Sequence, residues 1–335
     1  MEITNESGGN ELSVPVKDKT GRSVLAVIAK WTFVVDPSGH VELDDPGREP
    51  DLADTYNGED GAVSSIRRPS QIFEHKPGTD VILLGHAHPP LRGSATAVDV
   101  SLRVGPIQKT VRAHGLRVWQ SGTFGGLAPG PARPVREPIP LIYELAWGGQ
   151  DVTGDKPLGE WRNTVGRGVA RNPSTLIGQS AAQLEDPQNP IGHGDNVPAS
   201  FGAIHRHWMP RKQFAGTYDE VWEETKMPLL PDDFDPRFNV CVPHDQWSAT
   251  PLRGDEPIEV RGVTPEGVWR FALPRIAPGF SSVIDGRRAE HRTHLDTILI
   301  DADELRVELT WRAAIPLPPK YERLERVLLF EKDVL

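Results

Sequence analysis

The chain has 335 residues, of which 25% are charged and 37% are hydrophobic, and its formal net charge at pH 7 is -10. This acidic balance argues against a nucleic-acid partner, because binding to a phosphate backbone requires a basic surface. The 32 prolines and 32 glycines are spread along the whole sequence. Such a distribution predicts many short strands joined by shaped turns and ordered loops rather than a disordered chain.

The single cysteine, Cys241, excludes a disulfide within the chain and indicates a reducing compartment. The first residues are polar and contain no apolar signal core. No apolar run is long enough to span a bilayer. We therefore expect a protein without membrane insertion that is cytoplasmic, or that leaves the cytoplasm by a route that needs no cleaved signal.

The sequence begins with a polar, glycine-containing stretch, residues 1–12, which we expect to be a flexible tail. Residues 13–335 are expected to form one domain. Changes in composition divide it into a β subdomain at 13–150, a loop-rich middle at 151–250 and a second β subdomain at 251–335.

Alternating polar and apolar residues, or compact apolar runs, indicate strands in both outer parts of the chain. In the first 150 residues these strands are 23–35, 40–43, 80–85, 95–104, 110–119 and 139–147. In the last third they are 258–263, 268–273, 297–300, 305–311 and, as a strand or short helix, 323–331. The fold class is therefore mainly β, with antiparallel sandwich-like or barrel-like sheets at both ends and a long irregular middle.

One short helix is predicted in the middle, at about 217–226. Thr217 and Glu220 have the spacing of a capping box, and Pro228 ends the helix because the residue before proline avoids helical dihedral angles. A helix this short is not stable alone in water. We therefore expect it to be packed against the rest of the protein.

The aromatic face of this helix belongs to the most informative part of the chain, Phe201–Trp247. Tyr218, Val221 and Trp222 share one side of the helix, and other aromatic and arginine side chains lie on both sides of it in sequence. Protein interfaces are enriched in these residue types, but so are ordinary cores, and residue chemistry alone favours a core. The candidate partner-binding or motif-core residues are Trp208, Arg211, Phe214, Tyr218, Trp222, Asp233, Phe234, Asp245 and Gln246.

Histidines offer one route to an enzyme. Residues two apart share a face of a strand, so a His-x-His pair could supply two ligands to a metal. The close pairs are His86/His88, His205/His207 and His291/His294. A metal site needs a third ligand, and no spacing indicates one, so we interpret these histidines as structural.

Carboxylates offer a second route, because Asp232, Asp233 and Asp235 could bind a hard cation or form an acid/base pair. The flanking prolines, together with Arg211 and Arg237, favour a braced turn with ion pairs instead. Cys241 lies between two valines and is expected to be a buried small hydrophobe. The chain also lacks the Gly-x-Ser-x-Gly sequence of a serine hydrolase.

We therefore predict that the protein is not an enzyme and assign it no catalytic, metal-binding or cofactor-binding residue. The alternative is a β-sandwich hydrolase or carbohydrate-active enzyme that uses the three carboxylates or the histidine pairs. Two carboxylates at glycosidase separation in an open cleft would favour that alternative.

Long motifs in the middle of the chain resemble the domain of unknown function 2169 family. The central motif is carried by residues 211–222, 228–235 and 245–246. Shorter matching pieces are 31–33, 75–80, 143–149 and 189–194. The resemblance extends from about Val24 to Trp311, nearly the whole chain.

Members of that family occur in bacterial type VI secretion gene clusters and are regarded as adaptors or chaperones. They help load toxic effectors onto the spike, which is built from valine-glycine-repeat and PAAR-type proteins. The resemblance implies a cytoplasmic adaptor whose partners are a secreted effector and spike proteins, with Phe201–Trp247 as part of its binding surface. It supplies no catalytic residues. A structural component of the secretion apparatus is a further alternative.

Overall fold

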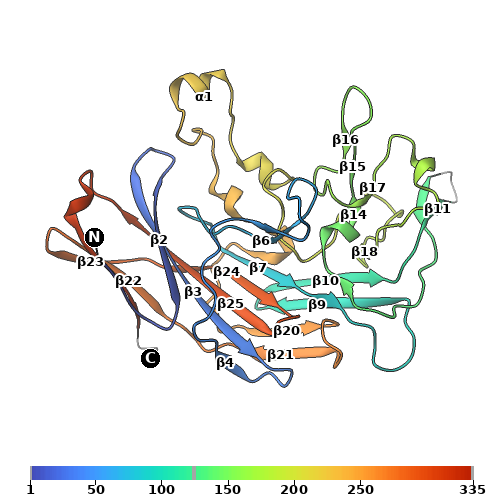
Figure 1. Cartoon of the computed structure of the whole chain (residues 1–335), viewed down its shortest axis with the longest axis horizontal. Helices are drawn as coiled ribbons and strands as arrows, with labels where there is room; N and C mark the ends of the chain where they lie inside the picture. Colours follow the sequence, from blue (N-terminus) through green and yellow to red (C-terminus); the bar gives the residue numbers. More distant parts are fainter. Residues whose placement is uncertain (1, 123–125, 333–335) are drawn as a thin grey trace.

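The computed structural model describes residues 2–122 and 126–332, and the fold is mainly β, as predicted. Its largest sheet has seven strands (Figure 1). Six of them run in the order β19 (Trp247–Ser248), β7 (Thr79–Leu84), β24 (His294–Asp301), β25 (Arg306–Pro316), β3 (Ser23–Val35) and β2 (Asn10–Lys17), and β4 (Val41–Leu43) pairs with β3. Neighbours are antiparallel except β7 and β24, which are parallel.

A second, fully antiparallel sheet has five strands. Its order is β18 (Leu184–Glu185), β10 (Ile107–His114), β9 (Ala97–Val104), β20 (Pro257–Arg261) and β21 (Val268–Ala272). Both larger sheets combine strands from the two ends of the chain. The proposed subdomains 13–150 and 251–335 therefore contribute to common sheets rather than forming one sheet system each.

A third sheet corrects the prediction of a loose N-terminal tail. It contains β1 (Glu2–Glu6), β26 (Leu324–Glu331), β22 (Pro278–Ile284) and β23 (Arg287–His291) in that order. β1 pairs in parallel with β26, and residues 10–12 belong to β2. The polar composition of residues 2–12 was misleading because their backbone pairs with distant strands, while residue 1 lies outside the described range. No sequence pattern indicated β22 or β23.

The remaining strands form short pairs in the irregular middle and around it. They are β5 (Thr55–Tyr56) with β6 (Ile66–Arg68), β8 (His86–Ala87) with β13 (Ile139–Pro140), β11 (Trp119–Ser121) with β12 (Leu127–Pro129), β14 (Trp147–Gly148) with β17 (Arg167–Gly168), and β15 (Gln150–Asp151) with β16 (Leu158–Gly159). The continuous strand expected at 139–147 is instead β13, a turn of 3-10 helix and β14.

Helical structure within the described residues is limited to α1 (Glu220–Thr225) and six short 3-10 helices. The latter are η1 (Tyr143–Leu145), η2 (Pro173–Leu176), η3 (Arg211–Phe214), η4 (Pro236–Asn239), η5 (His244–Gln246) and η6 (Tyr321–Arg323). None of these helices has the length and apolar character needed to cross a membrane.

The seven-stranded sheet has two chemically different faces. On one face of β3, Val27, Trp31 and Phe33 pack in a core shared with Val100 and Leu102 of the five-stranded sheet. β3 forms where it was predicted because its β-branched and aromatic residues fit a buried, pleated surface.

The opposite face of the sheet carries buried charges. Lys30 Nζ lies 2.7 Å from Asp51 Oδ2 and 3.2 Å from Glu308 Oε2, and Arg68 bonds to both carboxylates. These contacts hold the segment between β4 and β7 against the sheet at Asp51 and Arg68. Moving the segment away would break buried ion pairs and leave uncompensated charges, which is costly.

Candidate functional site

The segment Phe201–Trp247 contains two parts with different surroundings in the structure. Residues 201–214 and 239–247, here called the anchored part, contact the sheets. Residues 217–230, here called the arm, contain α1 and project from the top of the molecule in Figure 1.

Trp208 and Arg211 belong to the anchored part. Trp208 is only 3% exposed, and its ring lies edge-on to Tyr143 at 5.5 Å between centroids. The Arg211 guanidinium donates to the carbonyl oxygens of Ile204 at 2.7 Å and Phe238 at 2.9 Å. Burial lowers the pKa of Arg211. Arg211 therefore joins two passes of the chain and, contrary to expectation, does not pair with the nearby aspartates.

Gln246 and Asp245 also have structural contacts. Gln246 is fully buried and donates to the carbonyl oxygens of Val81 at 2.8 Å and Phe201 at 2.9 Å. Its own side-chain oxygen accepts from Lys109 Nζ at 2.8 Å, and Asp245 Oδ1 accepts from the same ammonium at 3.1 Å. Burial lowers the pKa of Lys109. These bonds connect the anchored part to both larger sheets.

The buried carboxylate of Asp80 connects the anchored part to β7 through Cys241. Asp80 Oδ2 accepts from Lys76 Nζ at 2.8 Å, from the Cys241 backbone N–H at 2.9 Å and from the Cys241 thiol at 3.1 Å. Burial, with Asp80 beside it, raises the pKa of the Cys241 thiol to about 12. The prediction that Cys241 is buried is confirmed.

The arm begins differently from the predicted capping box. Asp219, not Thr217, is the N-cap of α1, and its carboxylate accepts from the Trp222 backbone N–H at 2.9 Å. Thr217 instead donates its N–H at 2.9 Å and its hydroxyl at 2.8 Å to Asp233. These two bonds lower the pKa of Asp233. They also close the base of the arm.

The apolar side of the arm faces solvent. Val221 is 66% exposed, Met227 60% and Tyr218 54%. Trp222 is half-buried; its indole N–H donates to the Leu229 carbonyl at 2.9 Å, and its ring lies edge-on to Tyr218 at 4.7 Å. The expectation that this face packs against the rest of the protein is wrong. Trp222 contacts residues of the arm itself, and Tyr218, Val221 and Met227 stay exposed to solvent.

Two further contacts brace the arm. Leu229 packs against the β2–β3 turn, where a Cβ on Gly21 would lie 2.9 Å from the Leu229 Cδ1 atom. Gly21 also has a φ of 82°, a conformation that favours glycine. Lys226 Nζ pairs with Asp232 Oδ1 at 2.6 Å.

The last candidate residues lie below the arm. The Arg237 guanidinium lies 4.3 Å from the centre of the Phe214 ring and pairs with Asp235 at 2.6 Å. Phe234 lies at an angle to Phe238, with ring centroids 5.9 Å apart. The predicted braced turn is confirmed for Asp235, which also caps η4.

The His207 backbone N–H donates to His205 Nδ1 at 3.2 Å, and the two rings lie 5.2 Å apart. The other histidines have separate local contacts. His86 Nδ1 lies 2.8 Å from Asp303, His291 Nε2 lies 2.8 Å from the Ser282 hydroxyl, and His294 Nε2 lies 2.9 Å from the Lys76 carbonyl. In the part of the chain that the structure describes, no group of three or more His, Cys, Asp or Glu side chains is placed to hold a metal ion.

The anchored part and the arm both fall inside one family region. A family model described as "Uncharacterized protein conserved in bacteria (DUF2169)" matches residues 20–312. The chain belongs to this family. No match was found among curated proteins or among solved structures.

In this DUF2169 protein the sequence singled out the segment 201–247 but did not show which of its residues are buried and which are exposed. The buried partners Asp80, Lys76 and Lys109 were missed because they lie far from the segment in sequence. The exposure of Met227 was missed because the sequence pattern indicated only the end of a helix there. Its position between an acidic helix and a proline was a usable signal for a surface loop.

Proposed function

We propose that this DUF2169 protein is a cytoplasmic adaptor that binds a type VI secretion effector through the arm and delivers it to spike proteins. The observation that supports the proposal is an ordered projection whose large apolar side chains are exposed. The family resemblance supplies the kind of partner.

Exposed apolar side chains give the arm binding energy for a protein partner. Full burial of an exposed Val or Met side chain contributes roughly 1.5–3 kcal/mol, so covering the exposed part of Val221 or Met227 contributes about 1–2 kcal/mol each, and Tyr218 adds further apolar area. Tyrosine is also among the residues that most often dominate protein interfaces. A partner that covers these three side chains therefore gains several kcal/mol from a small contact area.

The arm is already ordered before a partner binds. The Asp219 cap, the bond from Trp222 to Leu229, and the bonds from Thr217 to Asp233 fix its conformation. Binding to such a structure costs less conformational entropy than folding a disordered segment. The arm is therefore suited to recognise one shape rather than any apolar surface.

The arm also carries negative charge. Glu220, Glu223 and Glu224 are exposed on α1. A partner surface with an apolar centre and a basic rim complements it, and complementary charge increases the association rate and the selectivity. We expect the binding to weaken as salt concentration rises.

The test is co-purification with the effector and spike protein encoded beside this gene. Changing Val221→Asp together with Met227→Asp should abolish recovery of the effector and leave the melting temperature unchanged. Leu52→Asp is the matched control, because Leu52 is also 66% exposed but lies outside the arm.

Deletion of the gene provides the functional measurement. Effector abundance and delivery should fall, and the unaltered gene should restore both, whereas the double arm variant should not. Unchanged effector abundance and delivery in the deletion strain would refute the adaptor role.

A further inference from the structure

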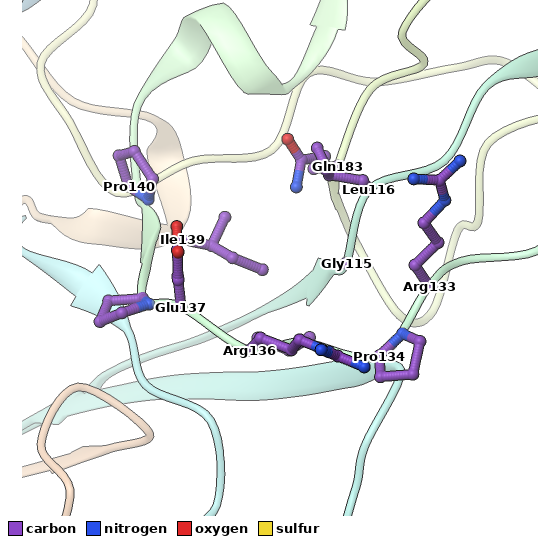
Figure 2. Close-up of a pocket in the computed structure, with 11 residues that line it drawn as sticks. Gly115, Leu116, Arg133, Pro134, Arg136, Glu137, Ile139, Pro140 and Gln183 are labelled. Atoms are coloured by element: carbon purple, nitrogen blue, oxygen red, sulfur yellow. The ribbon is translucent and has the colours of Figure 1, made fainter.

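A pocket of about 590 Å³ lies at the end of β10, beside the extended segment 133–140 (Figure 2). Its walls include the buried side chains of Val135 and Ile139 and the exposed side chain of Leu116. No residue of the arm lines it. The pocket is therefore a separate feature, and a ligand bound in it would not depend on the function proposed for the arm.

The backbone around this pocket is held in place on both sides. The Val135 N–H donates to the Ala95 carbonyl at 2.8 Å, and the Leu141 N–H donates to the Gly85 carbonyl at 3.0 Å. Between these two bonds, prolines at 138 and 140 favour an extended backbone, as does proline 134 just before the first bond. The pocket is thus largely preformed, as ligand sites usually are.

Close approach of the segment to β10 depends on a glycine. A Cβ at Gly115 would collide with the Arg133 carbonyl oxygen. The Arg133 N–H in turn donates to the Leu116 carbonyl at 2.9 Å. The segment that carries the two arginines is therefore fixed against the sheet rather than free to move away.

Two arginines and one glutamate line the pocket. Arg133 and Arg136 are exposed, and among residues 2–122 and 126–332 neither forms an ion pair, not even with Glu137. Figure 2 shows the Arg136 guanidinium beside Pro134 and the Arg133 guanidinium beside Leu116, with Glu137 on the opposite side, below Pro140. The pocket therefore has a cationic end and an anionic end with apolar side chains between them.

We propose that this pocket binds an extended segment of a partner protein that places one carboxylate between Arg133 and Arg136, whose exposed side chains turn toward it, and an apolar side chain over Ile139. Guanidinium groups present paired N–H donors that match a carboxylate. The apolar walls favour a side chain next to that carboxylate. Glu137 disfavours a polyanion, because a second negative charge in the pocket would lie beside its carboxylate.

The test begins with selection of short random peptides against the full chain, from one phage library that displays them with free N-termini and a second that displays them with free C-termini. Enriched peptides should carry Asp, Glu or a free C-terminus next to apolar residues. Fluorescence anisotropy with a labelled, selected peptide should then show about tenfold weaker binding for Arg133→Ala and for Arg136→Ala, because each removes a charge-assisted hydrogen bond. Glu137→Gln should bind at least as tightly as the unaltered protein.

Three controls make the result specific. Arg287→Ala with Arg288→Ala removes two exposed arginines of β23 that form no ion pair within the described part of the chain, and should leave binding unchanged. The arm variant Val221→Asp with Met227→Asp should also bind the peptide normally. Failure of the proposal for the pocket can therefore be distinguished from failure of the proposal for the arm. Thermal melts should match the unaltered protein because both pocket arginines are exposed.

Peptide variants identify the source of the carboxylate. Loss of binding after C-terminal amidation assigns it to a chain end, and loss after Asp→Asn or Glu→Gln assigns it to a side chain. The proposal is overturned if no peptide with an acidic residue or an essential free C-terminus is enriched, or if neither amidation of the peptide nor its Asp→Asn or Glu→Gln substitution weakens binding. It is also overturned if the Arg133→Ala, Arg136→Ala double variant binds as well as the unaltered protein.

Discussion

The anchored part and the arm are neighbours in sequence and both contain aromatic residues, yet they differ in burial and in bonding. In the anchored part Trp208, Arg211 and Gln246 are buried, and Gln246 donates to the Val81 carbonyl of β7. In the arm Val221 and Met227 are exposed, and most of the hydrogen bonds are local. A high density of aromatic residues therefore marks a segment of interest without showing whether it is core or interface. The anchored part is buried because polar side chains from distant parts of the chain, such as Asp80 and Lys109, bond to it, and the arm lacks such partners among the described residues.

The largest expected effect on the anchored part comes from Asp80→Ala. This change leaves the buried Lys76 ammonium without its carboxylate and should lower the free energy of unfolding by roughly 3–5 kcal/mol. Chemical denaturation measures it. Asp232→Ala is the control, since this carboxylate is exposed and its ion pair with Lys226 contributes at most about 1 kcal/mol. A loss below about 1 kcal/mol for Asp80→Ala would show that the anchored part is not held by this contact.

The labelling rate of Cys241 tests the same contact in the unaltered, folded protein. With its pKa raised to about 12, the thiol loses its proton only at very alkaline pH. At pH 8 its reaction with a disulfide reagent should therefore be about a thousandfold slower than that of an ordinary thiol. Absorbance of the released thiolate measures the rate. Asp80→Ala should accelerate labelling, and rapid labelling of the unaltered native protein would contradict the buried position.

Gln246→Leu should have a smaller effect. It removes two hydrogen bonds to buried carbonyls and one from Lys109, and each unsatisfied buried group costs about 1–3 kcal/mol. Part of this cost is offset by the added apolar surface, so we expect a net loss of about 2 kcal/mol. Denaturant unfolding again gives the value, with the exposed Gln108→Leu as a near-neutral comparison. If Gln246→Leu left the free energy of unfolding unchanged, the hydrogen bonds of Gln246 would not be what stabilises the anchored part.

The smallest effect on global stability is expected in the arm, from Trp222→Ala. Because Trp222 contacts mainly the arm itself, the free energy of global unfolding should change by less than about 1 kcal/mol. Hydrogen exchange should rise in residues 217–230 and stay unchanged in β3. Trp222→Phe keeps an aromatic ring but loses the bond to Leu229, so it should give an intermediate result. Loss of protection in β3 would show that the arm and the sheets unfold together.

The sequence predicted features that depend on local pattern. β3 matches its expected bounds because its apolar run is long and bounded by turn residues. The N-cap was misassigned by two residues because Thr217 and Asp219 are both capping residue types, and only the position of Asp233 decides between them. The strand at residues 2–6 could not be predicted, since its partner β26 lies at the other end of the chain.

The site was predicted less well than the fold for the same reason. Exposure of Val221 and burial of Arg211 follow from which side of the segment meets the sheets, and a single sequence does not contain that information. The pocket at Arg133 and Arg136 was not predicted, although two arginines between closely spaced prolines are a sequence signal for it. Such a segment is extended, exposed and charged, and these properties are common in recognition loops.

The interleaving of strands from both ends also determines when the protein can fold during synthesis. β3 pairs with β25 over residues 24–34, so the central pair of the largest sheet cannot form until residues 306–316 have left the ribosome. Until then β3 presents an unpaired apolar edge, the kind of surface that promotes association between nascent chains. Long-range pairing of this type also slows folding, because distant segments must meet before any contact stabilises them. A protein proposed to assist the export of others is thus itself exposed to aggregation until the C-terminal strands of its own sheets have been made.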